Sequence, residues 1–214
     1  MKIAIIGAAG RTGRQVLEQA LARGHEVVAI ARDPRRTPNG SISEEPGRVR
    51  TVAATAIDVA ALTGAFTEVD VVISALGPNK TSGDRVLTTG ITATLAAMEA
   101  AGIRRLVVVS ASGHLTDGDA WPVRILVKPI LGAFLRTSYA DMREMERIVQ
   151  ASDTDWTIMR PPKLSDKGAR GGYQSRRNLN VRRGFTMTRA DLATAILDQL
   201  DDLGTIRQAV SVAN

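Results

Sequence analysis

The chain has 214 residues, of which 44% are hydrophobic, and this is enough to bury the core of a single α/β domain. It contains no cysteine, so disulfides and thiolate metal sites are excluded, and two histidines without a cluster of carboxylates at ligand spacing predict that no metal is bound. The net charge is +6, but the basic residues form small clusters with few aromatic residues beside them, which favours a solvated surface over a nucleic-acid partner.

The predicted elements alternate regularly between strand and helix. Residues 3–6 form an apolar run that ends at Gly7, as in a strand buried on both faces of a parallel sheet. This run is too short for a signal peptide or a membrane span, so we expect a cytoplasmic protein without a membrane partner. The alternation predicts a single α/β domain over residues 1–214, Rossmann-like, with a doubly wound parallel sheet and helices on both faces. The further predicted strands are 26–31, 49–54, 69–74, 106–109 and 156–159, and the helices are 12–22, 59–66, 85–101 and 139–151.

The other segments are less regular. Residues 39–47 are rich in Gly, Pro and Ser and are predicted to form a surface loop. The polar segment 165–183 is predicted to be a loop or a mobile flap. A last helix is predicted over 189–200, with Thr188 as its cap, and residues 206–212 are predicted to add an edge strand.

Three glycines mark the turn between the first strand and the first helix. Gly7 permits a sharp exit from the strand, Gly10 lets phosphates approach the backbone, and Gly13 lets the helix pack against the sheet. Arg11 and Thr12 add a cation and a hydroxyl. A turn of this kind directs backbone N–H groups and the positive end of the helix at an anion, although the same glycines also suit a purely structural turn. The pattern predicts a site for the diphosphate of a nicotinamide dinucleotide.

The end of the second predicted strand bears on the choice of cofactor. An acid at this place accepts the ribose hydroxyls of NAD, but here the strand is followed by Arg32, whose guanidinium suits a 2′-phosphate. Arg35 or Arg36 is expected to assist. Asp33 leaves the alternative open, because a small backbone shift makes it the ribose partner. We therefore predict that NADP(H) is preferred over NAD(H).

With these motifs, the chain from residue 1 to about residue 200 resembles the atypical short-chain dehydrogenases/reductases, the group of NmrA-like proteins and of the biliverdin reductase B type of flavin reductase. The resemblance implies an NADPH-binding fold in which residues from about 161 to 214 complete a small substrate pocket over the nicotinamide. The motifs are Gly7-x-x-Gly10-x-x-Gly13, Ala31-Arg32-Asp33-Pro34, residues 69–73, residues 102–112 and Arg160-Pro161-Pro162.

On the adenosine side, the chain departs from this family at one place. The family often carries Gly-Asp after the third strand, with the acid near adenine, whereas residues 54–56 read Ala-Thr-Ala. The adenine contacts are then expected from the Thr55 hydroxyl or from backbone groups of Thr55 and Ala56. The resemblance places three further residues on this side: Ala75, Leu76 and Gly77.

On the nicotinamide side, the resemblance implies that Ser110 to Ser112 and Pro161 to Lys163 flank the ring. Ser110 and Ser112 end the fifth strand, where open α/β sheets bind ligands, but either hydroxyl also suits a strand-end backbone contact. His114 follows in the same loop and has a suitable pKa range for proton transfer, although a single histidine without a partner is more often a surface residue. Lys163 is a candidate for the cofactor phosphates or an acidic substrate, or is simply solvated.

Tyr139 is the candidate proton donor. The wider superfamily uses Tyr-x-x-x-Lys, and this chain has Tyr139-x-x-x-Arg143, with the two side chains one helical turn apart. If the guanidinium lowers the pKa of the phenol, Tyr139 becomes a general acid. The alternative is a helix in which Tyr139 packs and Arg143 pairs with nearby acids.

These residues predict an NADPH-dependent oxidoreductase that transfers hydride to a small conjugated acceptor such as a flavin, quinone or tetrapyrrole. Such a transfer requires mainly that two rings be stacked, so the missing lysine does little harm. An alternative is a non-catalytic, NADP(H)-sensing regulatory protein of NmrA-like type. A sugar-nucleotide epimerase or dehydratase is disfavoured, because only about 50 residues follow Pro162 and the substrate lobe needs more. We expect a monomer or a weak homodimer.

Overall fold

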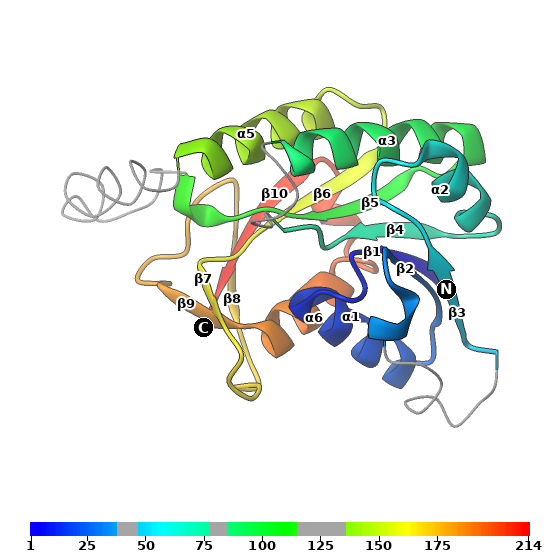
Figure 1. The fold of residues 1–214 in the computed structure, drawn as a ribbon. Coiled ribbons are helices and arrows are strands. Elements are labelled where there is room, and N and C mark those ends of the chain that lie inside the picture. The colour runs from blue at the N-terminus through cyan, green and yellow to red at the C-terminus, as the bar shows by residue number, and fades with distance from the viewer. Residues whose placement is uncertain (38–46, 78–84, 115–135) are drawn as a thin grey trace.

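A central eight-stranded sheet organises the structure (Figure 1). The computed structural model describes residues 1–37, 47–77, 85–114 and 136–214. The strand order is β3-β2-β1-β4-β5-β6-β10-β8, and neighbouring strands are parallel except for β10 and β8. The order reverses between β1 and β4, which is where open α/β sheets bind ligands, and the predicted Rossmann-like fold is confirmed. The strands of this sheet are β1 (Lys2–Ile6), β2 (Glu26–Ala31), β3 (Val49–Ala53), β4 (Val71–Ser74), β5 (Arg105–Val109), β6 (Asp155–Arg160), β8 (Gln174–Arg177) and β10 (Gln208–Ala213).

Helices cover both faces of the sheet, as predicted. The side chains of β1 explain why its sequence is apolar throughout: Ile3 and Ile5 lie in one buried cluster, and Ala4 and Ile6 lie in another on the opposite face. None of the described helices is long and apolar enough to cross a membrane. The first face carries α1 (Arg11–Ala22) and α6 (Arg189–Asp198), and the second carries α2 (Val59–Ala65), α3 (Val86–Ala101) and α5 (Arg136–Gln150).

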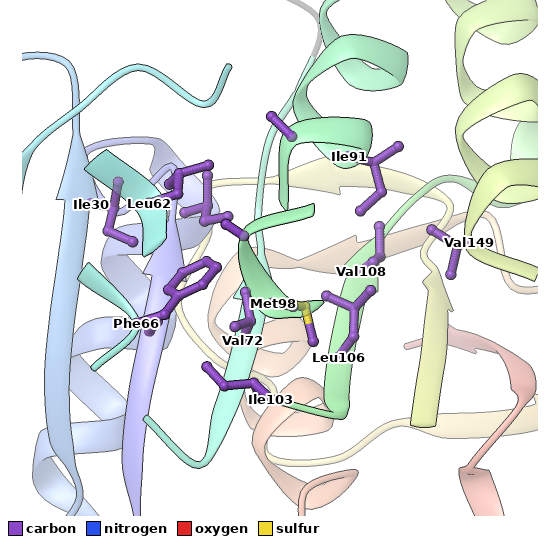
Figure 2. Close-up of a cluster of buried hydrophobic side chains, with 14 of the residues drawn as sticks. Ile30, Leu62, Phe66, Val72, Ile91, Met98, Ile103, Leu106, Val108 and Val149 are labelled. Carbon is purple, nitrogen blue, oxygen red and sulfur yellow. The ribbon is translucent and has the colours of Figure 1, made fainter. Parts of the chain in front are cut away.

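One of the two hydrophobic clusters lies between the sheet and helices α2, α3 and α5, and it supports the strand ends that form the site. Figure 2 shows Phe66 at the end of α2, Ile91 on α3 and Val149 on α5 directed toward the strands. Leu106 and Val108 of β5 face the same cluster and are fully buried. Burying side chains of this size stabilises the fold by about 1.5–3 kcal/mol each, so the carboxyl ends of β4 and β5 are held on a rigid base.

The polar segment 165–183 differs from its prediction as a loop or flap. It contains β8, which pairs antiparallel with β10, and it is flanked by a parallel pair, β7 (Lys163–Ser165) with β9 (Thr186–Thr188). Strand β8 was missed because its residues are polar on both faces, as an edge strand exposed to solvent tolerates. The strand predicted near residues 206–212 is present as β10, but its predicted place at the edge of the sheet is wrong. Strand β10 lies inside the sheet, between β6 and β8. The loop predicted over residues 39–47 lies outside the described residues except for Gly47.

The turn between β7 and β8 is tied to the start of α6 by Asp191. Thr188 caps this helix as predicted, by accepting a hydrogen bond from the Asp191 backbone. The Asp191 carboxylate accepts hydrogen bonds from the backbone N–H groups of Arg170 at 2.9 Å and Gly171 at 3.2 Å, and from the amide of Asn214. A buried carboxylate thus docks a segment of the chain that is otherwise polar and exposed.

We expect Asp191→Asn to lower the free energy of unfolding by about 2 kcal/mol at pH 7, because two backbone donors lose a charged acceptor. Desolvation acts to raise the pKa of Asp191, but hydrogen bonds from Thr188, Arg170, Asn214 and Gly171 outweigh it and hold the pKa below its ordinary value. The contribution is therefore complete above the unfolded pKa, about 4, and is lost as pH falls through the lower folded pKa.

Urea unfolding followed by circular dichroism between pH 3 and 7 measures this effect. The difference between the wild-type protein and the variant should shrink as the pH falls below about 4. The control is Asp201→Asn, which removes an exposed carboxylate and should leave stability unchanged. A difference that stays constant over this pH range contradicts the role assigned to the Asp191 charge.

Candidate functional site

The turn from β1 to α1 uses its three glycines for different reasons. Gly7 has a φ of +81°, and a Cβ there lies 3.1 Å from the Ala75 carbonyl oxygen at the end of β4. At Gly13 a Cβ collides with the Gly7 carbonyl oxygen and lies 2.8 Å from the Gly7 carbonyl carbon. At Gly10, by contrast, the Gly7 carbonyl oxygen at 3.1 Å is the one near contact among the described residues. The positive φ of Gly7 and the backbone collision at Gly13 thus make these two glycines requirements of the fold, whereas at Gly10 a side chain meets one backbone atom, which must shift by a few tenths of an ångström.

The start of α1 has the properties of an anion site. Its N-cap is Gly10, so no side chain caps the helix, and its first turn contains no acidic residue. The first N–H groups of a helix have no partner within the helix, and they stand at its positive end. Arg11, on this turn, is exposed, and the side chain of Thr12 is partly buried beside it. The geometry fits a diphosphate bound to backbone amides over Gly10.

At the end of β2, the acidic residue Asp33 forms an ion pair with Arg35. The Asp33 carboxylate accepts hydrogen bonds from the Arg35 backbone N–H at 3.1 Å and from Arg35 Nε at 3.0 Å. Arg35, mainly through its side-chain hydrogen bond, holds the pKa of Asp33 below its ordinary value. Arg32 and Arg36 have exposed side chains, and the Arg36 carbonyl oxygen accepts a hydrogen bond from Arg14 Nη2 at 3.0 Å.

The residues expected on the adenosine side follow β3 and β4. Thr55 is exposed, Ala56 and Leu76 are partly buried, and both of these contact α3 at Gly90. A Cβ at Gly90 lies 2.7 Å from Leu76 Cδ1, so the missing side chain leaves room for Leu76 against this helix. Sequence reasoning missed Gly90, although a glycine within a helix is unfavourable by about 1 kcal/mol and for that reason signals a packing or functional need. Ala75 is partly buried and Gly77 is exposed.

The ends of β5 and β6 bring the other candidates together. The Ser110 backbone N–H donates to the Met159 carbonyl oxygen and the Ser112 backbone N–H to that of Pro161, each at 2.8 Å, so pairing continues beyond the two strands. Ser110 is 5% exposed, and its Oγ has no hydrogen-bond partner among the described residues. Buried hydroxyls are almost always paired, so the partner of this one lies outside the described residues, and at this edge of the sheet a bound ligand is a candidate for it.

Tyr139 lies against the short helix η2 (Ser112–His114). Its side chain is 8% exposed, and a Cβ on Gly113 collides with the phenol oxygen and lies 3.1 Å from Cζ. Burial raises the pKa of Tyr139, whereas Arg143 is exposed. Of the two alternatives for Tyr139, its burial agrees with the packed one, and desolvation shifts the phenol pKa in the opposite direction to the lowering that Arg143 would cause.

The remaining candidates are less well enclosed. Lys163 is exposed on β7, and Pro161, two residues before it, is buried. The side chain of His114 lies outside the described part of the structure. Within the described residues, no group of three or more His, Cys, Asp or Glu side chains is placed to hold a metal ion.

Two buried carboxylates that sequence reasoning missed hold α5 in place. Asp141 accepts hydrogen bonds from the backbone N–H groups of Leu87 and Thr88, each at 2.9 Å, and so caps α3 from a neighbouring helix. Glu146 pairs with Arg160 at 3.0 and 2.5 Å, which anchors the end of β6 to α5. These contacts join residues 14 and 53–54 positions apart in the sequence, so no local pattern signals them.

The chain is similar to known proteins over nearly its whole length. Residues 7–203 match the family model described as NAD(P)H-binding. The chain is 30% identical over 208 residues to the uncharacterized protein YwnB of Bacillus subtilis (strain 168), with 94% of this chain and 92% of YwnB covered. The structure matches ChuY, an anaerobillin reductase from Escherichia coli O157:H7, with a TM-score of 0.76 and 25% identity over 100% of this chain and 97% of ChuY.

A short-chain dehydrogenase/reductase of Veillonella parvula, solved in complex with NADP, matches with a TM-score of 0.82 and 20% identity, and 100% of this chain and 94% of that one are covered. The three glycines of the turn, the uncapped start of α1 and the match over residues 7–203 agree with one another. The chain belongs to the NAD(P)H-binding family, with the Rossmann fold of the short-chain dehydrogenases/reductases.

Proposed function

We propose that the protein is an NADPH-dependent reductase that transfers hydride to a small conjugated acceptor of the flavin, quinone or tetrapyrrole type. The observation that carries this proposal is the buried Ser110 hydroxyl, which has no partner among the described residues and lies at the carboxyl end of β5. A hydroxyl held there is placed to bind the nicotinamide carboxamide or the acceptor. The likeness to ChuY, itself an anaerobillin reductase, supports the reductase class.

In this proposal the chain positions two rings and excludes water. The turn from Gly7 to Gly13 holds the diphosphate, and Ser110 together with Pro161 bounds the nicotinamide side. The bound reduced nicotinamide supplies the hydride. Tyr139, whose pKa is raised by burial, stays protonated at neutral pH and is available as a proton donor. Hydride transfer to a flat acceptor requires little beyond stacked rings and a proton donor, so arginine at position 143 in place of lysine is tolerated.

The preference for NADPH rests on the end of β2. Asp33 is paired with Arg35, and Arg32 has an exposed side chain, which favours a 2′-phosphate over two ribose hydroxyls at this place. Residues 1–214 then form one NAD(P)-binding domain in which the segment from about residue 161 completes the substrate pocket, with Lys163 at its rim. The acceptor is a small molecule.

The test is steady-state oxidation of NADPH with FMN, a quinone series and biliverdin. Ser110→Ala should reduce kcat by about 10-fold or more, since one hydrogen bond in a buried site is worth about 1.5 kcal/mol. The control is Ser175→Ala, which removes an exposed hydroxyl on β8 and should leave kcat unchanged. Turnover with none of the acceptors despite tight NADPH binding supports the non-catalytic sensing role instead, and absence of binding defeats both.

A further inference from the structure

A basic pocket of about 520 Å³ lies between the first turn of α1 and the turn that follows β7. It is bounded by Ala9 of the glycine turn and by residue 36 just beyond β2, so it adjoins the place proposed for the diphosphate on one side and the end of β2 on the other. The charged side chains that line it are Arg11, Arg14, Arg36, Lys167 and Arg189, with Asp166 as the acid.

Asp166 bridges two of these cations. Its carboxylate lies 2.8 Å from Arg11 Nη1 and 2.6 Å from Arg189 Nη1. The side chains of Arg11 and Asp166 are 71% and 57% exposed, whereas that of Arg189 is 12% exposed. Arg189 is therefore a largely buried anchor for Asp166, and Arg11 is a solvated partner whose pairing with Asp166 contributes little stability.

Arg14 is held in the pocket in a different way. Its Nη2 donates to the Arg36 carbonyl oxygen, which directs the guanidinium toward the end of β2, and no carboxylate pairs with Arg14 among the described residues. The pocket thus holds an oriented cation beside an exchangeable one. A phosphate monoester, with a charge close to −2 and three acceptor oxygens, is the kind of ligand that such a pair binds better than a single carboxylate does.

We propose that this pocket receives the 2′-phosphate of the cofactor and that Asp166 sets the selectivity for it, by competing with the phosphate for Arg11. The inference rests on the proposed function for the identity of the ligand, and it goes beyond it by assigning the preference for NADP(H) to Arg14 and Asp166 rather than to Arg32 alone. Desolvation acts to raise the pKa of Asp166, but Arg11 and Arg189 hold it below its ordinary value, so the competing carboxylate is charged at neutral pH.

The test is the equilibrium binding of NADP⁺ and NAD⁺, measured by calorimetry at about 50 mM ionic strength, where exposed charges are weakly screened. Asp166→Asn should tighten NADP⁺ binding by about 3- to 10-fold and change NAD⁺ binding by less than about 2-fold, because a competing charge is removed from one subsite only. Arg14→Gln should weaken NADP⁺ binding by about 10-fold or more and leave NAD⁺ binding nearly unchanged. The matched control for lost charge is Asp201→Asn, an exposed residue three positions beyond the C-terminal end of α6, which should alter neither constant.

If Asp166→Asn leaves the ratio of the NADP⁺ and NAD⁺ dissociation constants unchanged, the proposal is overturned. If it weakens the binding of both nucleotides equally, the proposal is also overturned, because that is the result expected of a purely structural ion pair. Competition by inorganic phosphate separates a 2′-phosphate subsite from a general anion site: it should weaken NADP⁺ binding and spare NAD⁺ binding, and equal weakening of both counts against the proposal. If the constants shift as expected but no acceptor is reduced, the selectivity assignment stands and the proposed reductase activity fails. If neither nucleotide binds to the wild-type protein, both fail.

Discussion

Gly10→Val is expected to weaken NADP⁺ binding by about 100-fold or more while the protein remains folded. The backbone at Gly10 has φ −75° and ψ 162°, which is extended and suits valine. The added Cβ meets the Gly7 carbonyl oxygen at 3.1 Å, a contact that a shift of a few tenths of an ångström relieves. The side chain then fills the space where the proposed diphosphate reaches the amides of α1. Two charge-assisted hydrogen bonds lost at about 1.5–3 kcal/mol each account for the factor.

Calorimetry for binding and thermal unfolding for stability measure this variant. Gly64→Val is the control, because Gly64 is exposed on α2 with open space around it. Gly13→Ala is the contrasting variant: its Cβ collides with the backbone of Gly7, so we expect a lower Tm as well as lost binding. If Gly10→Val bound NADP⁺ as tightly as the wild-type protein, the glycine turn would not be the diphosphate site.

Glu146→Gln is expected to lower the free energy of unfolding by about 3–5 kcal/mol, the loss typical of a buried ion pair that is broken on one side. Arg160 is 7% exposed, so its guanidinium is left without its carboxylate in a place that water barely reaches. Because Arg160 ends β6 and Pro161 follows it, the nicotinamide side of the site should loosen together with the fold.

Urea unfolding at pH 7 measures the loss, and α5 supplies a matched control. Glu144 pairs with Arg147 on the exposed side of the same helix, and Glu144→Gln should leave stability nearly unchanged. The double variant Glu146→Leu with Arg160→Met removes both charges and should recover most of the loss. Equal effects of Glu144→Gln and Glu146→Gln would show that burial does not govern the strength of this pair.

The sequence by itself determines the parts of the protein that neighbouring residues specify. The apolar runs of β1 and β5, the helical spacing in α1 and the glycines between β1 and α1 are local patterns, because backbone sterics and the periodicity of side chains act over a few residues. The strand-turn-helix motif at Gly7 to Gly13 therefore indicates both the fold and the proposed place of the nucleotide.

Only the tertiary structure decides the contacts between distant segments. The polar strand β8 is a strand because β10 offers it an edge, and Tyr139 has a raised pKa because η2 covers it. Asp166 meets Arg11 across 155 residues of sequence, and no periodicity relates two such positions. Local propensity is a property of adjacent residues, whereas burial, desolvation and charge pairing are properties of whatever the folded chain brings together, so the proposed selectivity of the site depends on contacts that no local pattern encodes.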